Sequence, residues 1–80
     1  MKYTVYILHP EKDNKRYIGF TDNIESRFIE HNMGKVKSTK NRRPLKIMHT
    51  EEYENKTEAM QRESYFKTHA GRDYLKSIGK

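Results

Sequence analysis

The sequence predicts an α+β fold, arranged as an α/β sandwich, in which a small three-stranded antiparallel sheet is flanked by helices in the order ββαβα. Three short segments are typical of strands, because they are rich in β-branched and aromatic residues or alternate apolar with polar ones. Two longer segments repeat their apolar residues at the helical period. Eighty residues suffice for one domain, residues 1–80, with a small core.

The first two strands are expected at residues 2–8, KYTVYIL, and 16–20, RYIGF. The connection between them, residues 9–15, contains Pro10, Asp13 and Asn14, which favour turns, so the two strands are expected to pair as a hairpin. Gly19 weakens the second strand, and a glycine at such a position often marks the close approach of a ligand or another segment of backbone.

The segment 21–34 is predicted to form a helix that borders the core with polar side chains. Ile24 and Phe28 define its buried stripe, and Arg27 and His31 fall within the same sector of roughly 100°. Arg27 could direct its guanidinium to water, and His31 could be an ordinary residue near the end of the helix. Taken singly, neither residue indicates a site.

The third strand is expected at residues 44–53, PLKIMHTEEY. Its side chains alternate, with Leu45, Ile47 and His49 on one face and Lys46, Met48 and Thr50 on the other. This period of two is the pattern of a half-buried strand.

The second helix, residues 58–71, places a carboxylate among its apolar residues. At the helical period the core-facing stripe contains Ala59, Met60, Phe66 and Ala70, together with Glu63. A carboxylate on a buried stripe is costly unless it is paired or binds a cation. Glu63 is therefore expected either to pair with Arg27 or Lys67, or to bind a divalent cation such as Mg²⁺ with water and substrate oxygens.

The net charge of +6 is concentrated in one segment of the sequence. Residues 34–46 contain six basic residues and no acidic one, which leaves 11 basic and 11 acidic residues elsewhere. Such a segment suits the phosphate backbone of a nucleic acid, although a solvated loop would have the same composition. The expected phosphate-binding residues of this loop are Lys35, Lys37, Thr39, Lys40, Arg42 and Arg43.

The composition excludes several other classes of protein. There is no cysteine, so neither a disulfide nor a thiolate metal site is expected. The apolar run in residues 4–8 is too short for a signal peptide or a membrane span. A cytoplasmic protein that does not act at a membrane is expected, monomeric by default.

If the two helices pack over the hairpin, the polar residues could converge on its tyrosines. A carboxylate that binds a metal, an arginine, a histidine and the phenols of Tyr6 and Tyr17 would then share one site. The metal and the arginine would stabilise charge that develops on a phosphate, and a base would activate water. The set fits hydrolysis of a phosphodiester.

These residues resemble the GIY-YIG nuclease superfamily over almost the whole chain. TVY, residues 4–6, stands where the family has its first motif, and YIG, residues 17–19, matches the second. SRFIEHN resembles the helix that bears the family's arginine, and EAMQRESYFK resembles the segment that bears its metal-binding glutamate. The short length resembles the small stand-alone bacterial branch of UPF0213-like proteins.

The resemblance implies hydrolysis of DNA by water, with one Mg²⁺ or Mn²⁺ ion held by Glu63. It implies that Tyr6 and Tyr17 orient or deprotonate the attacking water, that Arg27 binds the scissile phosphate, and that His31 assists. The general base stays open between Tyr6 and His31, and Gly19 is counted among the residues close to the DNA. Thr4 and Val5 depart from the Gly and Ile of the family.

Three functions remain to be compared. The first is an endonuclease directed by DNA structure, such as branches, flaps or damage, with RNA kept open as a substrate and a protein partner as a source of specificity. The second is a nucleic-acid-binding module, or a partner-dependent subunit, without turnover of its own. The third is a protein-interaction adaptor, which only the exposed charge favours.

Overall fold

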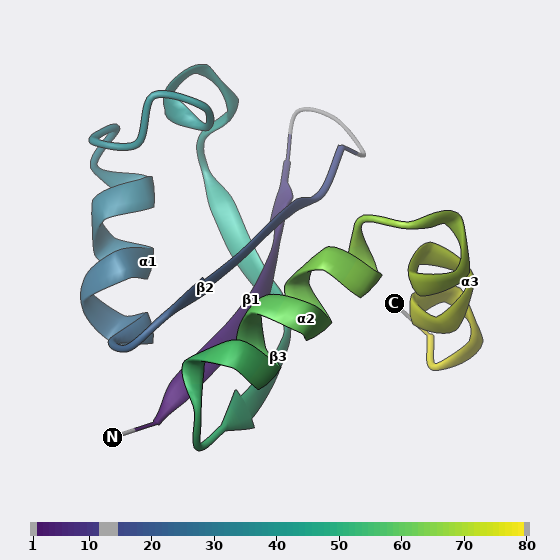
Figure 1. Cartoon of the computed structure of the whole chain (residues 1–80). Helices are drawn as coiled ribbons and strands as arrows, with labels where there is room; N and C mark the ends of the chain where they lie inside the picture. The colour runs from purple at the N-terminus through teal and green to yellow at the C-terminus, as the bar shows by residue number, and fades with distance from the viewer. Residues whose placement is uncertain (1, 12–14, 80) are drawn as a thin grey trace.

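A computed structural model describes residues 2–11 and 15–79 of the chain, and Figure 1 traces its helices and strands. Of the residues expected in the hairpin turn, Pro10 is instead part of a strand and lies opposite Leu45, and Asp13 and Asn14 lie outside the described residues. The described elements, in chain order, are β1 (Tyr3–Pro10), β2 (Tyr17–Thr21), α1 (Ile24–Asn32), the 3₁₀ helix η1 (Lys40–Arg42), β3 (Leu45–Tyr53), α2 (Lys56–Phe66) and α3 (His69–Ser77).

The sheet is antiparallel, with β1 in the centre and the strand order β2-β1-β3, so the predicted α+β fold is confirmed. Tyr6 of β1 lies opposite Gly19 of β2 in this register. Because successive side chains of a strand point to opposite faces, Val5 and Ile7 lie on one face of β1, and Tyr6 and Leu8 lie on the other.

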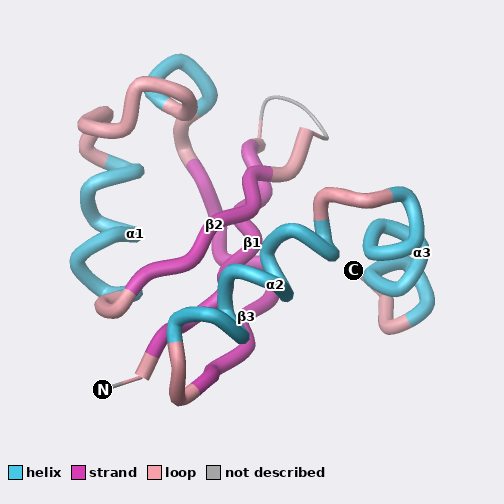
Figure 2. Tube along the Cα trace, in the orientation of Figure 1, coloured by secondary structure: helices cyan, strands magenta, loops and turns pink. Residues whose placement is uncertain are grey.

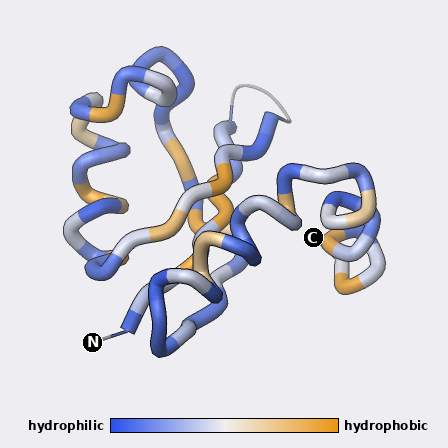
Figure 3. Tube along the Cα trace, in the orientation of Figure 1, coloured by the Kyte–Doolittle hydropathy of each residue, from blue (hydrophilic) through white to orange (hydrophobic). Residues whose placement is uncertain are grey.

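Helices cover both faces of the sheet and divide the core in two (Figure 2). On one face, Val5 and Ile7 pack with residues of α2 and α3, including Phe66. On the other face, Tyr6 and Leu8 pack with Leu45 and with partly buried residues of α1. Figure 3 shows hydrophobic segments in the strands at the centre, and hydrophilic segments over much of the surrounding helices and loops. Of the described helices, none combines the length and the apolar character that crossing a membrane requires.

A bulge in the β1–β3 pairing changes the face of β3 that meets the core. Ile7 lies opposite His49, and the next residue, Leu8, lies opposite Ile47, so Met48 is an extra residue on β3. The predicted single face shared by Leu45, Ile47 and His49 is therefore wrong. His49 faces the α2 side, where its ring meets Phe66 with centroids 6.0 Å apart, and Ile47 is 44% exposed.

The predicted helix over residues 58–71 is two helices. Helix α2 ends at Phe66 and α3 begins at His69, because the Thr68 hydroxyl accepts the Gly71 amide hydrogen as an N-cap. Ala59 and Phe66 are buried as predicted, but Met60 and Ala70 are exposed. The helical period had been extended beyond the end of α2, so Ala70 belongs to a helix with a different axis.

Gly71 is expected to be essential for the packing of α3 on α2. A methyl group in its place would lie 2.6 Å from Phe66 Cα and would overlap the Tyr65 carbonyl oxygen, and these backbone atoms cannot move aside cheaply. Gly71→Ala should lower the free energy of unfolding by about 1–3 kcal/mol, measured by urea denaturation. Ser64→Ala, at an exposed position of α2, is the control. A change below about 0.5 kcal/mol in Gly71→Ala would contradict this packing.

A charged network joins β3 to α2 on the side of the sheet away from α1. The carboxylate of Glu51, whose side chain is 17% exposed, accepts hydrogen bonds from Arg62 Nε at 2.7 Å, the Tyr53 hydroxyl at 2.7 Å and His49 Nε2 at 2.8 Å. The Arg62 guanidinium in turn lies over three aromatic rings, 4.6 Å from the centroid of Phe66 and 4.9 Å from those of Tyr65 and Tyr74.

Candidate active site

Two tyrosines and a histidine meet on the α1 side of the sheet. Tyr6 comes from the central strand, Tyr17 from the edge strand and His31 from α1. The Tyr17 and His31 rings are edge to face with centroids 4.9 Å apart, and the Tyr6 ring lies 5.7 Å from His31 and 6.2 Å from Tyr17. The predicted convergence of these three residues is present in the fold.

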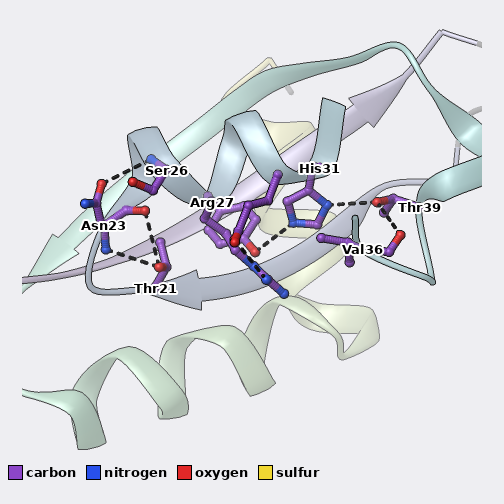
Figure 4. Close-up of polar contacts among 9 residues, drawn as sticks. Thr21, Asn23, Ser26, Arg27, His31, Val36 and Thr39 are labelled. Carbon is purple, nitrogen blue, oxygen red and sulfur yellow. Dashed lines mark hydrogen bonds and ion pairs between the residues drawn. The ribbon is translucent and has the colours of Figure 1, made fainter. Parts of the chain in front are cut away.

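Helix α1 presents His31 and Arg27 from the same face, one turn apart. The helix begins at Ile24 because the Asn23 side chain accepts the Ser26 amide hydrogen, and the Thr21 hydroxyl accepts the Asn23 amide hydrogen (Figure 4). These caps fix the start of the helix directly after β2. Residues at i and i+4 then lie above one another, and this spacing brings both polar side chains toward the tyrosines.

A chain of hydrogen bonds fixes the imidazole of His31, which is fully buried rather than exposed at a helix end. Its Nε2 lies 3.1 Å from the Tyr6 hydroxyl and its Nδ1 lies 2.8 Å from Thr39 Oγ1. Thr39 donates its single hydroxyl hydrogen to the Val36 carbonyl, so it accepts from Nδ1–H. In the neutral imidazole, Nε2 is consequently the acceptor that faces the Tyr6 hydroxyl.

Burial sets the protonation states of this pair. It lowers the pKa of His31 to about 4, with the positive charge of Arg27 acting in the same direction. Burial also raises the pKa of Tyr6 above its usual value, although a hydrogen bond with Arg27 opposes the rise. At neutral pH the site therefore contains a protonated phenol that faces an unprotonated imidazole.

Gly19 allows Tyr6 to approach β2 closely. A methyl group at this position would lie 2.8 Å from the Tyr6 hydroxyl oxygen and 3.2 Å from a ring carbon of Tyr17. Gly19 is buried, and what approaches it is the phenol of Tyr6. The glycine of YIG therefore makes room for the Tyr6 side chain.

Arg27 lies at the open side of the cluster. Its side chain is 37% exposed, pairs with Glu30 at 3.4 Å and makes a hydrogen bond with Tyr6, which raises the pKa of Arg27 further. Figure 4 shows the side chain extending from α1 beside His31 toward the side where α2 lies. The Arg27 side chain is therefore partly accessible to an anion.

Glu63 is on α2, a helix that packs on the opposite face of the sheet from α1 but contacts the edge strand β2. Its side chain is 20% exposed and its carboxylate lies 3.8 Å from Lys67 Nζ. Glu63 thus lies at the border of the buried face centred on Ala59 and Phe66, at the edge of the core. The expected pair with Lys67 is present.

The described residues contain no cluster of three or more carboxylate, imidazole or thiolate groups able to enclose a metal ion. Glu63 is partly exposed and only loosely paired, which fits an ion that takes one carboxylate from the protein and the rest of its ligands from water and phosphate. The residues therefore fit an Mg²⁺ or Mn²⁺ site in which the substrate and water supply most of the ligands. They do not fit a closed structural metal site.

The basic loop is anchored to the site, and one of its expected phosphate ligands is buried. Val36 is almost completely buried and Thr39 is fully buried, so Thr39 positions His31 and is not available to a phosphate. Arg43 Nε donates to the Lys40 carbonyl at 2.9 Å, and Lys46 pairs with Glu11. The exposed basic side chains of the segment are Lys35, Lys37, Lys40, Arg43 and Lys46, and Arg42 is half-buried.

The role of Thr39 was missed because the sequence places it among exposed basic residues. Its signal was the pair Val36 and Thr39, an apolar and a small polar residue three positions apart in an otherwise charged loop. Such a pair marks the turn by which a loop contacts the core. Of the five residues predicted to form the catalytic set, the structure joins Tyr6, Tyr17, Arg27 and His31 by direct contacts. Glu63 belongs to α2, a helix that contacts β2 from the opposite face of the sheet.

Comparison with known proteins identifies relatives over nearly the whole length of the chain. Residues 2–75 match the protein family described as the GIY-YIG catalytic domain. A UPF0213 protein of Staphylococcus haemolyticus is 45% identical over 78 residues, which cover 96% of this chain and 94% of that protein. A UPF0213 protein of Natronomonas pharaonis is 42% identical over 65 residues, which cover 80% and 75% of the respective chains.

A solved structure shares the fold. The solution NMR structure of the UPF0213 protein BH0048 from Bacillus halodurans matches with a TM-score of 0.61 and 30% sequence identity. The match covers 99% of this chain and 86% of that one. The sheet and helices described above are therefore a shared architecture.

Proposed function

Since the chain belongs to the GIY-YIG catalytic domain family, whose members are nucleases that act on nucleic acids, we propose that it is a metal-dependent endonuclease that hydrolyses phosphodiester bonds in DNA. The observation that carries the proposal is the hydrogen-bond chain from Tyr6 through His31 to Thr39, beside the accessible guanidinium of Arg27. In such a chain a proton can pass from the Tyr6 hydroxyl to His31 Nε2.

Tyr6 is the residue that contacts the attacking water, and His31 is the final proton acceptor. As the phenolic oxygen takes a proton from water, the Tyr6 hydroxyl passes its own proton to His31 Nε2, 3.1 Å away. His31 is ready for this step because its pKa is about 4, which leaves Nε2 unprotonated at neutral pH. Tyr17 packs against the imidazole and orients the same water.

Arg27 binds the scissile phosphate. Its guanidinium is partly exposed next to Tyr6 and can donate to two phosphate oxygens at once, so it stabilises the negative charge of the transition state. Lys35, Lys37 and Lys40 on the neighbouring loop bind phosphates of the same DNA backbone without reading its sequence.

Glu63 would hold the divalent ion that GIY-YIG nucleases generally use. Such an ion would supply stabilisation of the negative charge that develops during displacement at the phosphate. Glu63 belongs to α2 and Arg27 to α1, and both helices contact β2, so a DNA strand that lies along the edge of β2 would be within reach of both side chains.

The exposed basic side chains of the loop favour recognition of DNA structure over sequence, because they are suited to phosphates and not to base edges. Branched, flap-containing or damaged DNA, or a target presented by a partner protein, would suit such an enzyme. RNA is the alternative substrate, and a nucleic-acid-binding module without turnover is the alternative function.

The test is cleavage of labelled duplex, flap, fork and four-way-junction DNA in Mg²⁺ or Mn²⁺ by the wild type and by Glu63→Gln. Glu63→Gln keeps the shape of the side chain but removes the charge that would hold the ion. We expect cleavage by the wild type that disappears with EDTA and in Glu63→Gln, while both proteins bind DNA. Glu58→Gln, an exposed carboxylate on the same helix, is the matched control and should cleave like the wild type.

Equal cleavage by the wild type and Glu63→Gln would identify a contaminating nuclease or a different metal ligand, and would remove Glu63 from the mechanism. Binding of DNA without cleavage of any of the four substrates would favour the module without turnover.

A further inference from the structure

A groove on the other side of the sheet gathers basic residues that are far apart in the sequence. It has a volume of about 770 Å³ and lies between the start of β2 and helix α3. Lys15 and Arg16 line it from the segment that leads into β2, and Arg72 and Lys76 line it from α3. Among the described residues that line the groove, Asp73 contributes one carboxylate against these four cations, which leaves a positive excess.

The sequence hides this excess because the acidic residues lie elsewhere in the fold. Outside the basic loop the charges cancel as a sum, but five of the 11 acidic residues fall within residues 51–63, in β3, α2 and the turn between them. The folded protein therefore has a second positive surface in addition to the loop of residues 35–46.

The groove and the candidate active site open at the same edge of the sheet. Strand β2 is an edge strand, and its residues alternate between the two faces. Ile18 lines the groove, while its neighbours Tyr17 and Gly19 face the candidate active site, where Tyr17 contacts His31 and Gly19 contacts Tyr6. In Figure 1, α1 and α3 lie on opposite sides of this strand. A ligand that crosses the free edge of β2 would therefore meet both surfaces.

The spacing of the cations fits a polyanion. Arg72 and Lys76 are both exposed and stand about one helical turn apart, so each can meet a different phosphate. The longest extent of the protein is 29 Å, which corresponds to roughly nine base pairs at about 3.4 Å per step. Duplex DNA long enough to reach from the basic loop across β2 to α3 is thus a short oligonucleotide.

We propose that the groove between β2 and α3 binds the phosphate backbone of duplex DNA on one side of the cleavage position, while the basic loop binds it on the other. The inference rests on the proposed function, because the proposed cleavage site is what places the DNA between these two surfaces. The groove supplies affinity and orientation without reading bases, because its polar side chains are suited to phosphates.

The experiment compares the double variant Arg72→Gln/Lys76→Gln with Lys2→Gln/Lys56→Gln, which removes the same charge from exposed positions before β1 and at the start of α2. Binding of a fluorescein-labelled 16-base-pair duplex is followed by anisotropy in EDTA over a range of salt concentrations. The groove variant should reduce the slope of log K against log salt by about 2 and weaken binding roughly 10–100-fold at 0.1 M salt. The control should change neither the slope nor the affinity by more than about threefold.

Equal slopes for the two double variants would overturn the proposal, and so would a wild type that does not bind the duplex. Cleavage by the wild type that depends on Glu63, together with an unchanged salt slope in the groove variant, would contradict the groove proposal and support the proposed nuclease. Conversely, a reduced slope without cleavage by the wild type would support the groove and contradict the hydrolytic function.

Discussion

Tyr6→Phe is expected to lower kcat/KM for DNA cleavage by about 10²–10⁴-fold, the usual contribution of a positioned acid–base group. The substitution removes a single oxygen and keeps the ring that packs against Tyr17 and His31. The imidazole then has no phenol through which to accept a proton from water. The measurement is initial cleavage rate under subsaturating DNA, with urea denaturation to show that the variant stays folded.

Tyr3→Phe is the matched control for this substitution. Tyr3 belongs to the same strand but packs on the α2 side of the sheet, so the loss of its hydroxyl should leave cleavage unchanged. Less than a threefold loss of rate in Tyr6→Phe would contradict the proton chain.

The pH dependence of cleavage provides an independent test of the same chain. His31 must be neutral to accept a proton, and its lowered pKa of about 4 keeps it neutral well below pH 6.5. The rate should therefore persist as the pH falls from 7 to 5 and decline as it approaches 4. Thr39→Val removes the acceptor of Nδ1–H, so it should lower kcat and alter this acid limb, which a purely structural role would not move. A decline of the cleavage rate centred near pH 6.5 would indicate that a histidine with an ordinary pKa, and not the buried His31, acts as the base.

Glu51→Gln is expected to cause the largest loss of stability among single substitutions of surface-accessible carboxylates. Burial alone would raise the pKa of Glu51, but the hydrogen bonds from Arg62, and then from His49 and Tyr53, outweigh it and lower the pKa to about 2. Relative to the ordinary value of 4.5, this shift corresponds to about 3 kcal/mol of stability at neutral pH. Glu51→Gln should lose an amount of that order in urea denaturation at pH 7.

The same shift predicts how acid destabilises the protein. The carboxylate's contribution is complete above the unfolded pKa of 4.5 and is lost as the pH falls toward the folded value of about 2. His31 acts at higher pH, because the unfolded histidine takes up a proton near 6.5 and the folded one only near 4. Unfolding free energy should therefore fall in two stages, from pH 6.5 to 4 and from 4.5 to 2.

Comparison of variants separates the two stages. Glu51→Gln should flatten the stability curve below pH 4.5 and leave the upper stage intact. Glu52→Gln, the exposed neighbour on the same strand, should reproduce the wild-type curve. If both variants lose equal stability at pH 7, the network around Arg62 does not hold β3 to α2.

The parts of the fold that depend on local periodicity were predictable from the sequence, and those that depend on pairing between segments were not. The strands and α1 follow from apolar spacing. The bulge at Met48 does not, because only the register of β1 against β3 makes that residue an extra one. The break after Phe66 had a local signal in Thr68, but an uninterrupted apolar period through Ala70 concealed it.

The candidate site was predictable to the extent that its residues share one face of α1 and the matching face of the hairpin. Residues 27 and 31 are one turn apart, so their approach to Tyr6 follows from helix geometry. The contact of His31 with Thr39 joins a helix to a loop, and the pairing of Glu51 with Arg62 joins a strand to a helix. Such contacts depend on how the elements pack, and no spacing in the sequence specifies them.

The burial of Val36 and Thr39 couples the ordering of the basic loop to the orientation of the His31 imidazole. The segment that carries exposed Lys35, Lys37 and Lys40 is fastened to the core by the same threonine that holds the imidazole. Detaching the loop would release His31 Nδ1 from its acceptor and free the ring to turn away from Tyr6. By thermodynamic reciprocity, a ligand that binds the ordered loop also stabilises the orientation of His31 toward Tyr6.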